Sequence, residues 1–423
     1  MLKKNLIANY VGAAFVAGSQ LLLIPVYIKL LGERGWGIFS AVLALSAALL
    51  ILEAGVSLGI ARRFSALAPN ASGGVRSFLW IERRYLGAVA LFALTGIVLA
   101  APMSLWMLPS DTSNGVAVLR LTVVMAAAQI IGSLYRSVLV GTGNQVQLNV
   151  LLVVFTAVRH SAAVICAVAG GGTAAVAGAF ALGFVVEALF RRRSAYRVVR
   201  LQSSSDPTED SKKPSTTVPL GAATLAVAGA VGALGSQLDR LVLSRVVDPA
   251  TLGHYAIAAT LSLAVLQLVY PLSSALLPKL ERFRLTTERK RIVRRSYAML
   301  AALLSAVWIA ALLLSLGGLR RWLPSDSIAD AVRPLFLVHL GGTTLNALCV
   351  PLHLRLLSQH RDRAILMAAT LAFAVQLATL VFVSRRSGAL AGSVAWCAGN
   401  ATLLLALFLL QLQTTPNDEA STA

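Results

Sequence analysis

Charged residues interrupt several long apolar stretches of this sequence, among them Glu53, Arg120, Arg159, Asp239 and Arg240. A charge at the centre of a lipid bilayer costs roughly 2.5–3.5 kcal/mol on insertion scales, so such residues point into protein or into a wet cavity. The planar fork of an arginine matches a phosphate or diphosphate. A carboxylate can carry a proton or hold a neighbouring base. We therefore expect anion binding by the arginines and coupling or gating by the two acids.

Asp239 and Arg240 stand side by side in GSQLDRLVLS, residues 235–244. Adjacent helix residues diverge by about 100°, so these two charges do not simply neutralise each other. Asp239 shares a face with Ala228, Gly232 and Gly235, a surface suited to close helix packing. Arg240 shares a polar face with Ser236, Gln237 and Ser244. That face lines a cavity, or Arg240 lies near the outer boundary and extends its head to water.

Other predicted helices carry polar side chains on single faces. Glu53 is interpreted either as a functional acid or as a helix–helix hydrogen bond. Glu187 precedes Arg191 by one turn, which indicates a local ion pair. Arg62 and Arg63 mark the cytoplasmic side or meet an anionic headgroup. The shared faces are Asn9, Gln20 and Tyr27; Ser46, Glu53 and Ser57; and Asn149, Thr156 and His160, with Arg159 beside the last set.

The sequence contains no motif that indicates a catalytic or metal site. Cys166, Cys349 and Cys397 lie in separate apolar stretches without metal-ligand spacing, and the histidines form no HExxH group. No GxxxxGK[ST] loop occurs, and the glycines at 170–172 predict a turn between helices. We therefore expect no catalytic residue, no metal and no cofactor.

Composition identifies the class of protein. Hydrophobic residues make up 57% of the 423 residues and charged residues 13%, against roughly 25% charged in soluble domains. A soluble core could not bury so much apolar surface, so the chain is predicted to be an integral membrane protein. The net charge of +20 would indicate nucleic acid in a soluble domain. Here the basic residues gather between apolar spans, which indicates membrane topology and no nucleic-acid partner.

Apolar stretches of about 20 residues predict twelve transmembrane helices. Most Lys and Arg residues fall on one side when the spans alternate, so both termini are predicted to be cytoplasmic. The predicted spans are 5–31, 36–61, 79–101, 115–140, 145–169, 173–195, 218–246, 251–278, 297–317, 328–354, 364–384 and 388–411.

A polar stretch at 202–219 reads as a flexible linker between two groups of six spans. Residues 29–46 align without a gap over 245–262, which pairs Gly37 with Gly253 and Ser46 with Ser262. An even number of spans per half makes the repeats parallel. The predicted domains are a six-helix bundle at 1–200, a cytoplasmic linker at 201–217, a second six-helix bundle at 218–412 and a cytoplasmic tail at 413–423.

Three stretches resemble the bacterial polysaccharide transporters, flippases for lipid-linked oligosaccharides in the MOP superfamily that also holds the MATE multidrug exporters. LIPVYIKLLGERGWGIFSAVLAL (23–45) resembles the first hairpin of that family, and ILEAGVSLGIARRFSAL (51–67) resembles its next element. LDRLVLSRVVDPATLGHYAIA (238–258) resembles its seventh–eighth helix hairpin, where Asp-Arg and Gly-x-Tyr recur. The three stretches follow one another in the order and spacing of that family, and the resemblance covers nearly the whole chain.

The resemblance implies an all-α membrane fold of two six-helix bundles and a cationic cavity for a polyprenyl-linked diphosphate. It makes Glu53, Arg63, Asp239 and Arg240 candidate cavity or gating residues. Together with the arginines above, the predicted substrate-binding set is Arg240, Arg159, Arg120, Arg63 and Arg62, and the predicted coupling or gating set is Glu53 and Asp239.

The predicted function is a non-enzymatic flippase for an anionic polyprenyl-pyrophosphate-linked oligosaccharide, such as an O-antigen or lipopolysaccharide precursor, in the bacterial inner membrane. Its expected partners are this lipid, anionic membrane lipids and other polysaccharide-assembly proteins. The alternative is a cation-coupled multidrug exporter of the same fold, which would require buried acids in both halves. A membrane polymerase or ligase is disfavoured because the predicted outer loops are short.

Overall fold

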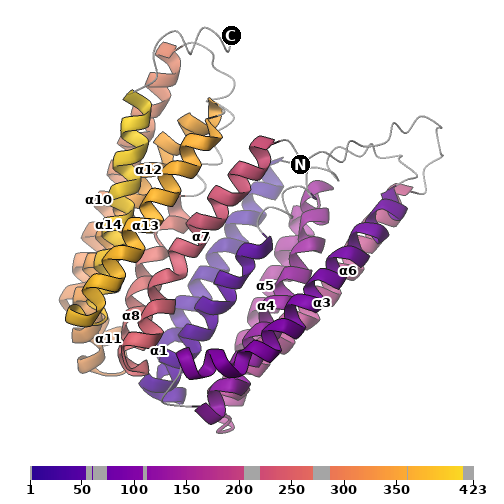
Figure 1. The fold of residues 1–423 in the computed structure, drawn as a ribbon, viewed down its shortest axis with the longest axis horizontal. Helices are drawn as coiled ribbons and strands as arrows, with labels where there is room; N and C mark the ends of the chain where they lie inside the picture. Colours follow the sequence, from indigo (N-terminus) through magenta and orange to yellow (C-terminus); the bar gives the residue numbers. More distant parts are fainter. Residues whose placement is uncertain are drawn as a thin grey trace. The chain divides into compact units, whose positions relative to one another are not determined.

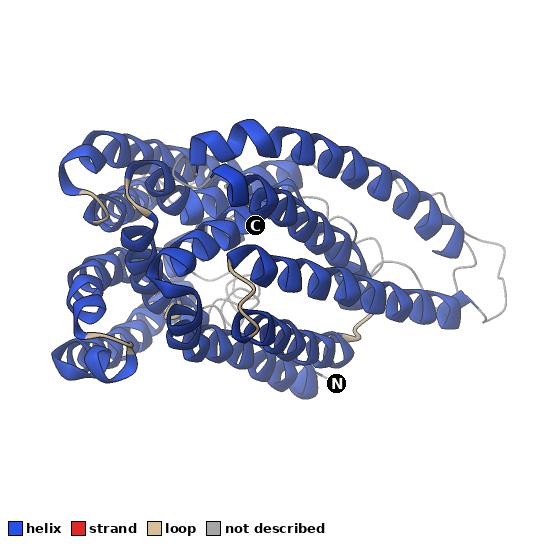
Figure 2. Cartoon of the chain, turned by 90° about the horizontal axis from the view of Figure 1, so that it is seen from below, coloured by secondary structure: helices blue, strands red, loops and turns tan. Residues whose placement is uncertain are grey.

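The computed structural model describes residues 2–53, 60, 74–107, 112–203, 220–269, 286–359 and 361–412. Helices joined by short turns make up this part of the chain, and no strand occurs within it (Figure 2). The chain divides into two compact units, residues 1–219 and residues 220–423. Chain colour in Figure 1 separates them, indigo to magenta for unit 1 and rose to yellow for unit 2.

Unit 1 is a bundle in which α6 packs against both α4 and α5, while α1 packs against α5 and α3 against α4. Apolar side chains and five aromatic or imidazole rings from α1, α5 and α6 fill its interior. Its helices are α1 (Leu2–Leu49), the 3₁₀ turn η1 (Leu50–Glu53), α3 (Gly74–Met107), α4 (Thr112–Gly141), α5 (Gln145–Val168) and α6 (Thr173–Ser203).

Unit 2 is organised around α14, which packs against α12 and α13. Helix α7 packs mainly against α13, and α8 packs against α12. Its helices are α7 (Leu220–Val246), α8 (Pro249–Leu263), α10 (Thr286–Leu313), the π-helical segment η2 (Leu314–Gly318), α11 (Leu319–Trp322), α12 (Asp326–Ser358), α13 (Asp362–Ser387) and α14 (Leu390–Leu412).

Within the described residues, ten helices are long and apolar enough to cross a membrane. The predicted span 5–31 and residues 36–49 of the next predicted span are joined in the long helix α1, because the backbone bends at Gly32 without forming a loop. Gly32 has φ 73° and ψ 169°, a conformation that glycine adopts readily. Helix α7 coincides with the predicted span 218–246 but is not among the ten. The all-helical membrane class is confirmed, whereas the count of twelve is not.

Local sequence explains where several helices begin and end. The turn predicted at 170–172 is present between α5 and α6, and Gly170 takes φ 79° there. Helix α8 begins with Pro249 after Asp248, whose carboxylate accepts hydrogen bonds from the backbone N–H groups of Ala250 and Thr251, both at 3.0 Å. This cap satisfies donors that the first turn of a helix otherwise leaves free. It fixes the tight connection between α7 and α8.

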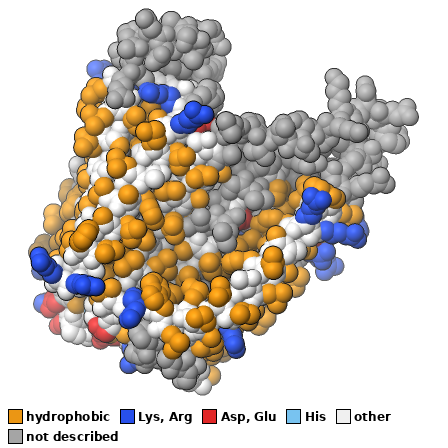
Figure 3. All heavy atoms as spheres, viewed as in Figure 1, with side chains coloured by type: hydrophobic (Ala, Val, Ile, Leu, Met, Phe, Trp, Pro, Cys, Tyr) orange, Lys and Arg blue, Asp and Glu red, His pale blue; other side chains and the backbone are white. Residues whose placement is uncertain are grey.

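Large apolar side chains cover the outside of the helices. Val98 is 73% exposed, Leu316 74% and Phe382 79%, values that a water-soluble bundle would avoid. Figure 3 shows hydrophobic side chains spread over the described face, with Lys and Arg side chains toward its margins. Lipid is the solvent that suits such a surface.

Candidate functional site

A carboxylate on α6 is held between two arginines inside unit 1. Glu187 accepts a hydrogen bond from Nη1 of Arg159 on α5, and its other oxygen pairs with Arg191 one turn later on α6. The side chains of Arg159 and Glu187 are 7% and 3% exposed. Arg159 also donates to Thr156 at 3.1 Å, and its guanidinium lies 4.0 Å from the ring centroid of Phe184. Both terminal nitrogens of Arg159 and one face of its guanidinium are therefore engaged.

A glycine makes room for this arrangement. A Cβ at position 183 on α6 would overlap the aliphatic stem of Arg159. Gly183 thus allows α5 and α6 to approach closely with the arginine between them. Substitution here would displace Arg159 from Glu187.

Glu53 extends the same cluster from η1. Its carboxylate shares a hydrogen bond with Ser133 on α4 and lies within electrostatic range of Arg136 and Arg191. Three guanidinium groups thus act on two carboxylates, which leaves an excess of one positive charge. The Arg136 side chain is exposed, and Nε of Arg191 is buried without a hydrogen-bond partner. These two groups, unlike Arg159, retain capacity to bind an anion.

A second carboxylate organises the last turns of α6. Glu82 on α3 is buried and accepts hydrogen bonds from Tyr135, Tyr196 and Arg192, the arginine at 2.9 Å. Beside it is an open pocket of about 570 Å³. The described residues that line this pocket are Leu189, Arg192, Arg193, Tyr196, Arg197 and Arg200. Glu82 therefore fixes one wall of a pocket that carries four arginines.

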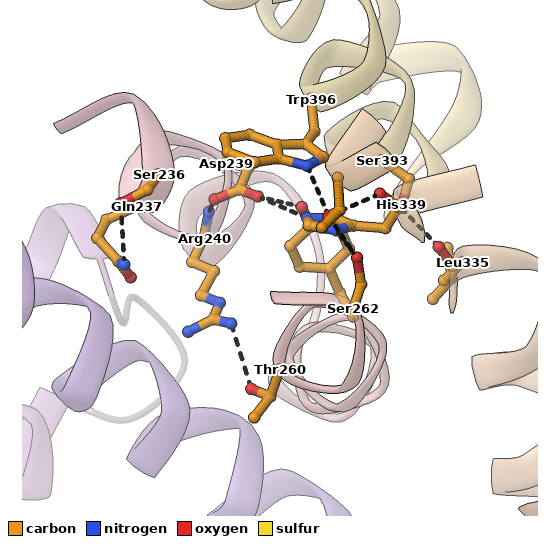
Figure 4. A network of polar contacts seen from close by, with 12 residues as sticks. Ser236, Gln237, Asp239, Arg240, Thr260, Ser262, Leu335, His339, Ser393 and Trp396 are labelled. Carbon is orange, nitrogen blue, oxygen red and sulfur yellow. Dashed lines mark hydrogen bonds and ion pairs between the residues drawn. The ribbon is translucent and has the colours of Figure 1, made fainter. Parts of the chain in front are cut away.

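The corresponding polar cluster of unit 2 surrounds Asp239, which is 1% exposed (Figure 4). Its carboxylate accepts a hydrogen bond from Tyr255 on α8, and its Oδ2 lies 3.6 Å from Nε2 of His339 on α12. The other imidazole nitrogen lies 3.0 Å from Oγ of Ser262. Trp396 on α14 stacks on the imidazole, with ring centroids 5.4 Å apart. Four helices thus supply one enclosed network.

Arg240 points away from this network, as Figure 4 shows. Its Nη2 donates to Thr260 at 3.2 Å, and its Nε has no hydrogen-bond partner. The Oδ1 atom of Asp239 accepts instead from the Arg240 backbone N–H at 2.7 Å. The two neighbouring charges therefore serve different surroundings, as the 100° divergence predicted. Gly235, on the Asp239 face, packs closely against Gln376 of α13, whose side chain donates to the Gly235 carbonyl at 2.8 Å.

The polar faces predicted on the first and fifth spans meet each other. Asn9 on α1 accepts from Asn149 on α5 at 2.6 Å, and Tyr27 lies 2.9 Å from Nδ1 of His160. Gln20, predicted on the same face of α1, is exposed. Pairing these groups between helices removes the cost of leaving them bare in lipid.

The structure places the remaining predicted residues as follows. Arg159 and Glu53 belong to one cluster in unit 1, and Asp239 and Arg240 lie on α7 in unit 2. Arg120 on α4 is exposed and lies outside both clusters. Arg62 and Arg63 fall outside the described residues, so their predicted role stays a prediction.

Sequence reasoning missed Glu82, Tyr255 and His339 as partners of these clusters. Glu82 stands in IERR at the start of a predicted span. Its negative charge among arginines was a signal in the sequence that could have indicated an ion pair. His339 is a single imidazole within an apolar stretch, and nothing near it in the sequence indicates Asp239 as its partner. Among the described residues, no group of three or more His, Cys, Asp and Glu side chains could hold a metal ion.

Residues 2–283 match a family of sequences described as "Polysaccharide biosynthesis protein". The match covers most of the chain, including all of unit 1 and the α7–α8 hairpin. No curated protein matches the chain by sequence.

Solved structures share the fold over nearly the full length. The lipid II flippase MurJ, in an inward closed conformation, has a TM-score of 0.68 at 12% identity, covering 98% of this chain and 88% of that one. The MATE multidrug transporter DinF-BH has a TM-score of 0.69 at 13% identity, covering 97% and 95%. A MOP superfamily transporter from Pyrococcus furiosus has a TM-score of 0.60 at 15% identity, covering 96% and 94%. At these identities the likeness establishes a MATE-like, MOP-type fold.

Proposed function

Because this chain belongs to the polysaccharide biosynthesis protein family, we propose that it is a flippase for a lipid-linked oligosaccharide. It moves an anionic polyprenyl-pyrophosphate-linked glycan from the cytoplasmic to the outer leaflet by alternating access. It acts as a transporter without catalytic chemistry, in the bacterial inner membrane and with both termini cytoplasmic. The glycan then enters a surface polysaccharide such as O-antigen.

The observation that carries this proposal is the arginine pocket of α6. Four arginines surround about 570 Å³, and the buried carboxylate of Glu82 holds one of them in place. Guanidinium groups bind phosphate oxygens with paired charged hydrogen bonds. The charge bias between predicted spans assigns this end of α6 to the cytoplasmic side. A diphosphate headgroup in the inner leaflet would meet this pocket first.

The residues predicted from the sequence take different parts in this proposal. Arg62, Arg63 and Arg240 are candidates for direct contact with the diphosphate. Arg159 acts as a positioning residue, because Glu187 and Thr156 already occupy its terminal nitrogens. Arg120 would meet only a substrate or a lipid at the outside of α4.

Complementation of a strain that lacks its own flippase tests the proposal. The double variant Arg193→Gln/Arg197→Gln removes two pocket charges without touching a buried network. We expect at least about a tenfold loss of surface glycan at normal protein abundance, the equivalent of one lost charged hydrogen bond.

The matched control is Arg385→Gln/Arg386→Gln, which removes two exposed charges in the last turn of α13. It should leave display intact. Equal display by both double variants at equal abundance would refute a role for the α6 pocket in transport.

A cation-coupled multidrug exporter is the second candidate, favoured by two acids in the apolar helices, the half-buried Glu53 in unit 1 and the buried Asp239 in unit 2. The same strains separate the two functions. Energy-dependent efflux of a cationic dye without rescue of glycan display would support the exporter. Rescue of display without dye efflux would support the flippase.

The topology is tested at the ends of two successive helices, Ser358 at the end of α12 and Ser387 at the end of α13. In a background without Cys166, Cys349 and Cys397, Ser387→Cys should react with a membrane-impermeant thiol reagent in intact cells, and Ser358→Cys should react only after lysis. The reverse pattern would overturn the assigned orientation.

A further inference from the structure

The surroundings of His339 contain a chain of hydroxyl groups that can point in either direction. Oγ of Ser262 lies 3.0 Å from Nδ1 of His339 and 2.6 Å from Oγ1 of Thr343. Thr343 has a second acceptor within reach, the backbone carbonyl of His339 at 3.2 Å, and it accepts from Nε1 of Trp396 at 3.1 Å. Hydroxyl protons rotate, so their direction follows the protonation state of the imidazole.

With a neutral imidazole, Thr343 donates to Ser262, Ser262 donates to Nδ1, and the Nε2–H points at the Asp239 carboxylate. With an added proton, the imidazole donates through Nδ1 to Ser262, Ser262 donates to Thr343, and Thr343 donates to the His339 carbonyl. The direction of this hydrogen-bond chain reverses through hydroxyl torsions alone. Each hydroxyl has an acceptor in both states, so the chain accommodates a proton without leaving a buried hydroxyl donor unsatisfied.

The charge balance favours one proton at this site. Asp239, Ser262, His339 and Thr343 are each at most 1% exposed. A proton on the His339 imidazole places a positive charge beside the buried Asp239 carboxylate, 3.6 Å away. The ionisable groups within electrostatic range of the network are Tyr255 on α8, Arg240 on α7 and Cys397 on α14. Tyr255 donates to Asp239, the Arg240 guanidinium points toward Thr260, and Cys397 donates to the Val338 carbonyl.

We infer that Asp239 and His339 form a binding site for a single exchangeable proton, with Ser262 and Thr343 as its reversible hydrogen-bond chain. Nε2 of His339 is buried without a hydrogen-bond partner and lies 3.6 Å from Oδ2 of Asp239. Protonation converts this gap into an ion pair and draws the two groups together. Loss of the proton releases them.

The position of the pair gives the proton a mechanical effect. Helix α7 packs mainly on α13, and α12 packs mainly on α14 and α8. Both helices also touch α8 and α14, but α7 and α12 have few direct contacts with each other, so the Asp239–His339 contact connects them directly. Protonation tightens the link between α7 and α12. If the proposed flippase function holds, this link couples proton exchange to transport.

Trp396 reports on the site directly, because its indole lies nearly parallel to the imidazole, at 12°. An imidazolium in stacking contact quenches indole fluorescence more strongly than a neutral imidazole. We expect the purified protein in nanodiscs, without any substrate, to lose fluorescence as pH falls. The pH-dependent component should be absent from Trp396→Phe and from His339→Gln.

Two further variants show whether the response belongs to the pair. Asp239→Asn removes the countercharge and should move the midpoint of quenching about 1–3 pH units lower. His353→Gln, on the same helix α12, is the matched control and should leave the curve unchanged. Size-exclusion profiles confirm that each variant is folded.

A flat wild-type curve, or an undiminished response in folded His339→Gln, would overturn the proton site. An Asp239→Asn midpoint equal to that of the wild type would overturn the pairing. Transport is measured in a separate experiment, by surface glycan display. If the fluorescence response is present but no strain gains glycan display, the flippase proposal fails and the proton site stands. If wild-type display depends on an imposed pH gradient and His339→Gln display does not, the site couples to transport.

Discussion

Unit 1 and unit 2 each bury a carboxylate at a helix interface, and they neutralise it differently. Glu187 faces two arginines, whose charge is permanent, and Arg159 fills its remaining hydrogen bonds with Thr156. Asp239 faces a tyrosine and a histidine, and a histidine can be neutral or charged. In the first arrangement, the arginines that hold α5 against α6 keep their charge across the physiological pH range. The second can respond to protons, so the difference separates a structural cluster from a switchable one.

The largest effect expected from this comparison comes from Glu187→Gln. The variant strands the buried guanidinium of Arg159 and the largely buried one of Arg191, neither of which can shed its charge; breaking a buried pair typically costs about 3–5 kcal/mol. Asp239→Asn should destabilise less, because His339 becomes neutral when its partner does. Unfolding in mixed detergent micelles measures both. Equal losses would remove the distinction between the two clusters.

Tyr255→Phe should have the next largest effect. It removes the hydroxyl that donates to Asp239 and leaves the fully buried ring in place. A hydrogen bond to a charged group contributes about 1.5–3 kcal/mol, and we expect a loss in that range. The same unfolding assay applies, with Tyr10→Phe on the exposed surface of α1 as control. A loss no greater than that of the control would mean that the Tyr255 hydroxyl does not help to hold Asp239.

Asp248 extends the comparison to an acid outside the spans. Burial acts to raise the pKa of Asp248, but hydrogen bonds from Thr251 and Ala250 outweigh it and lower the pKa below its ordinary value of 3.8. The ionised cap therefore stabilises the protein at pH values above the pKa that Asp248 has in the unfolded chain. This stabilisation is lost as the pH falls through the lower pKa that Asp248 has in the folded protein. Asp248→Ala should cost about 0.5–2 kcal/mol at pH 7.

The stability difference between wild type and Asp248→Ala should shrink as the pH is lowered below 3.8. Unfolding measured at neutral and acidic pH checks this. A difference that stays constant with pH would show that the cap acts through its shape and not through its charge.

Asp330→Asn should have the smallest effect. Asp330 pairs with Arg320 at 2.9 Å, but both side chains are more than half exposed. Water already solvates these charges, so we expect no measurable change in unfolding. A clear loss would show that ion pairing at the surface of unit 2 matters more than burial, contrary to the comparison.

Sequence reasoning identified the membrane class, the helical ranges and several local contacts. The Glu187–Arg191 pair follows from one-turn spacing, and the Asn9 and Asn149 faces follow from helical periodicity. The span count was less secure, because a glycine at Gly32 marks a turn or a bend equally well, and here it is a bend.

The partners of the buried charges could not be predicted in the same way. Arg159 finds Glu187 on the next helix, and Asp239 finds His339 about a hundred residues later. Such pairs depend on which helices are neighbours and how each is rotated, and periodicity along one helix carries no information on either. Glu82 similarly gathers groups from α4 and α6 that are far from it in the chain.

The sequence by itself determined that this protein lies in a membrane, since 57% hydrophobic residues in long runs have no other stable solvent. It also determined which helix faces are polar, because that depends only on the 3.6-residue repeat. Only the tertiary structure decided that Arg159 is neutralised by a permanent ion pair while Asp239 faces a histidine. The reason is physical: the state of a buried charge is set by the groups that packing brings within a few ångströms of it, and those groups come from other helices.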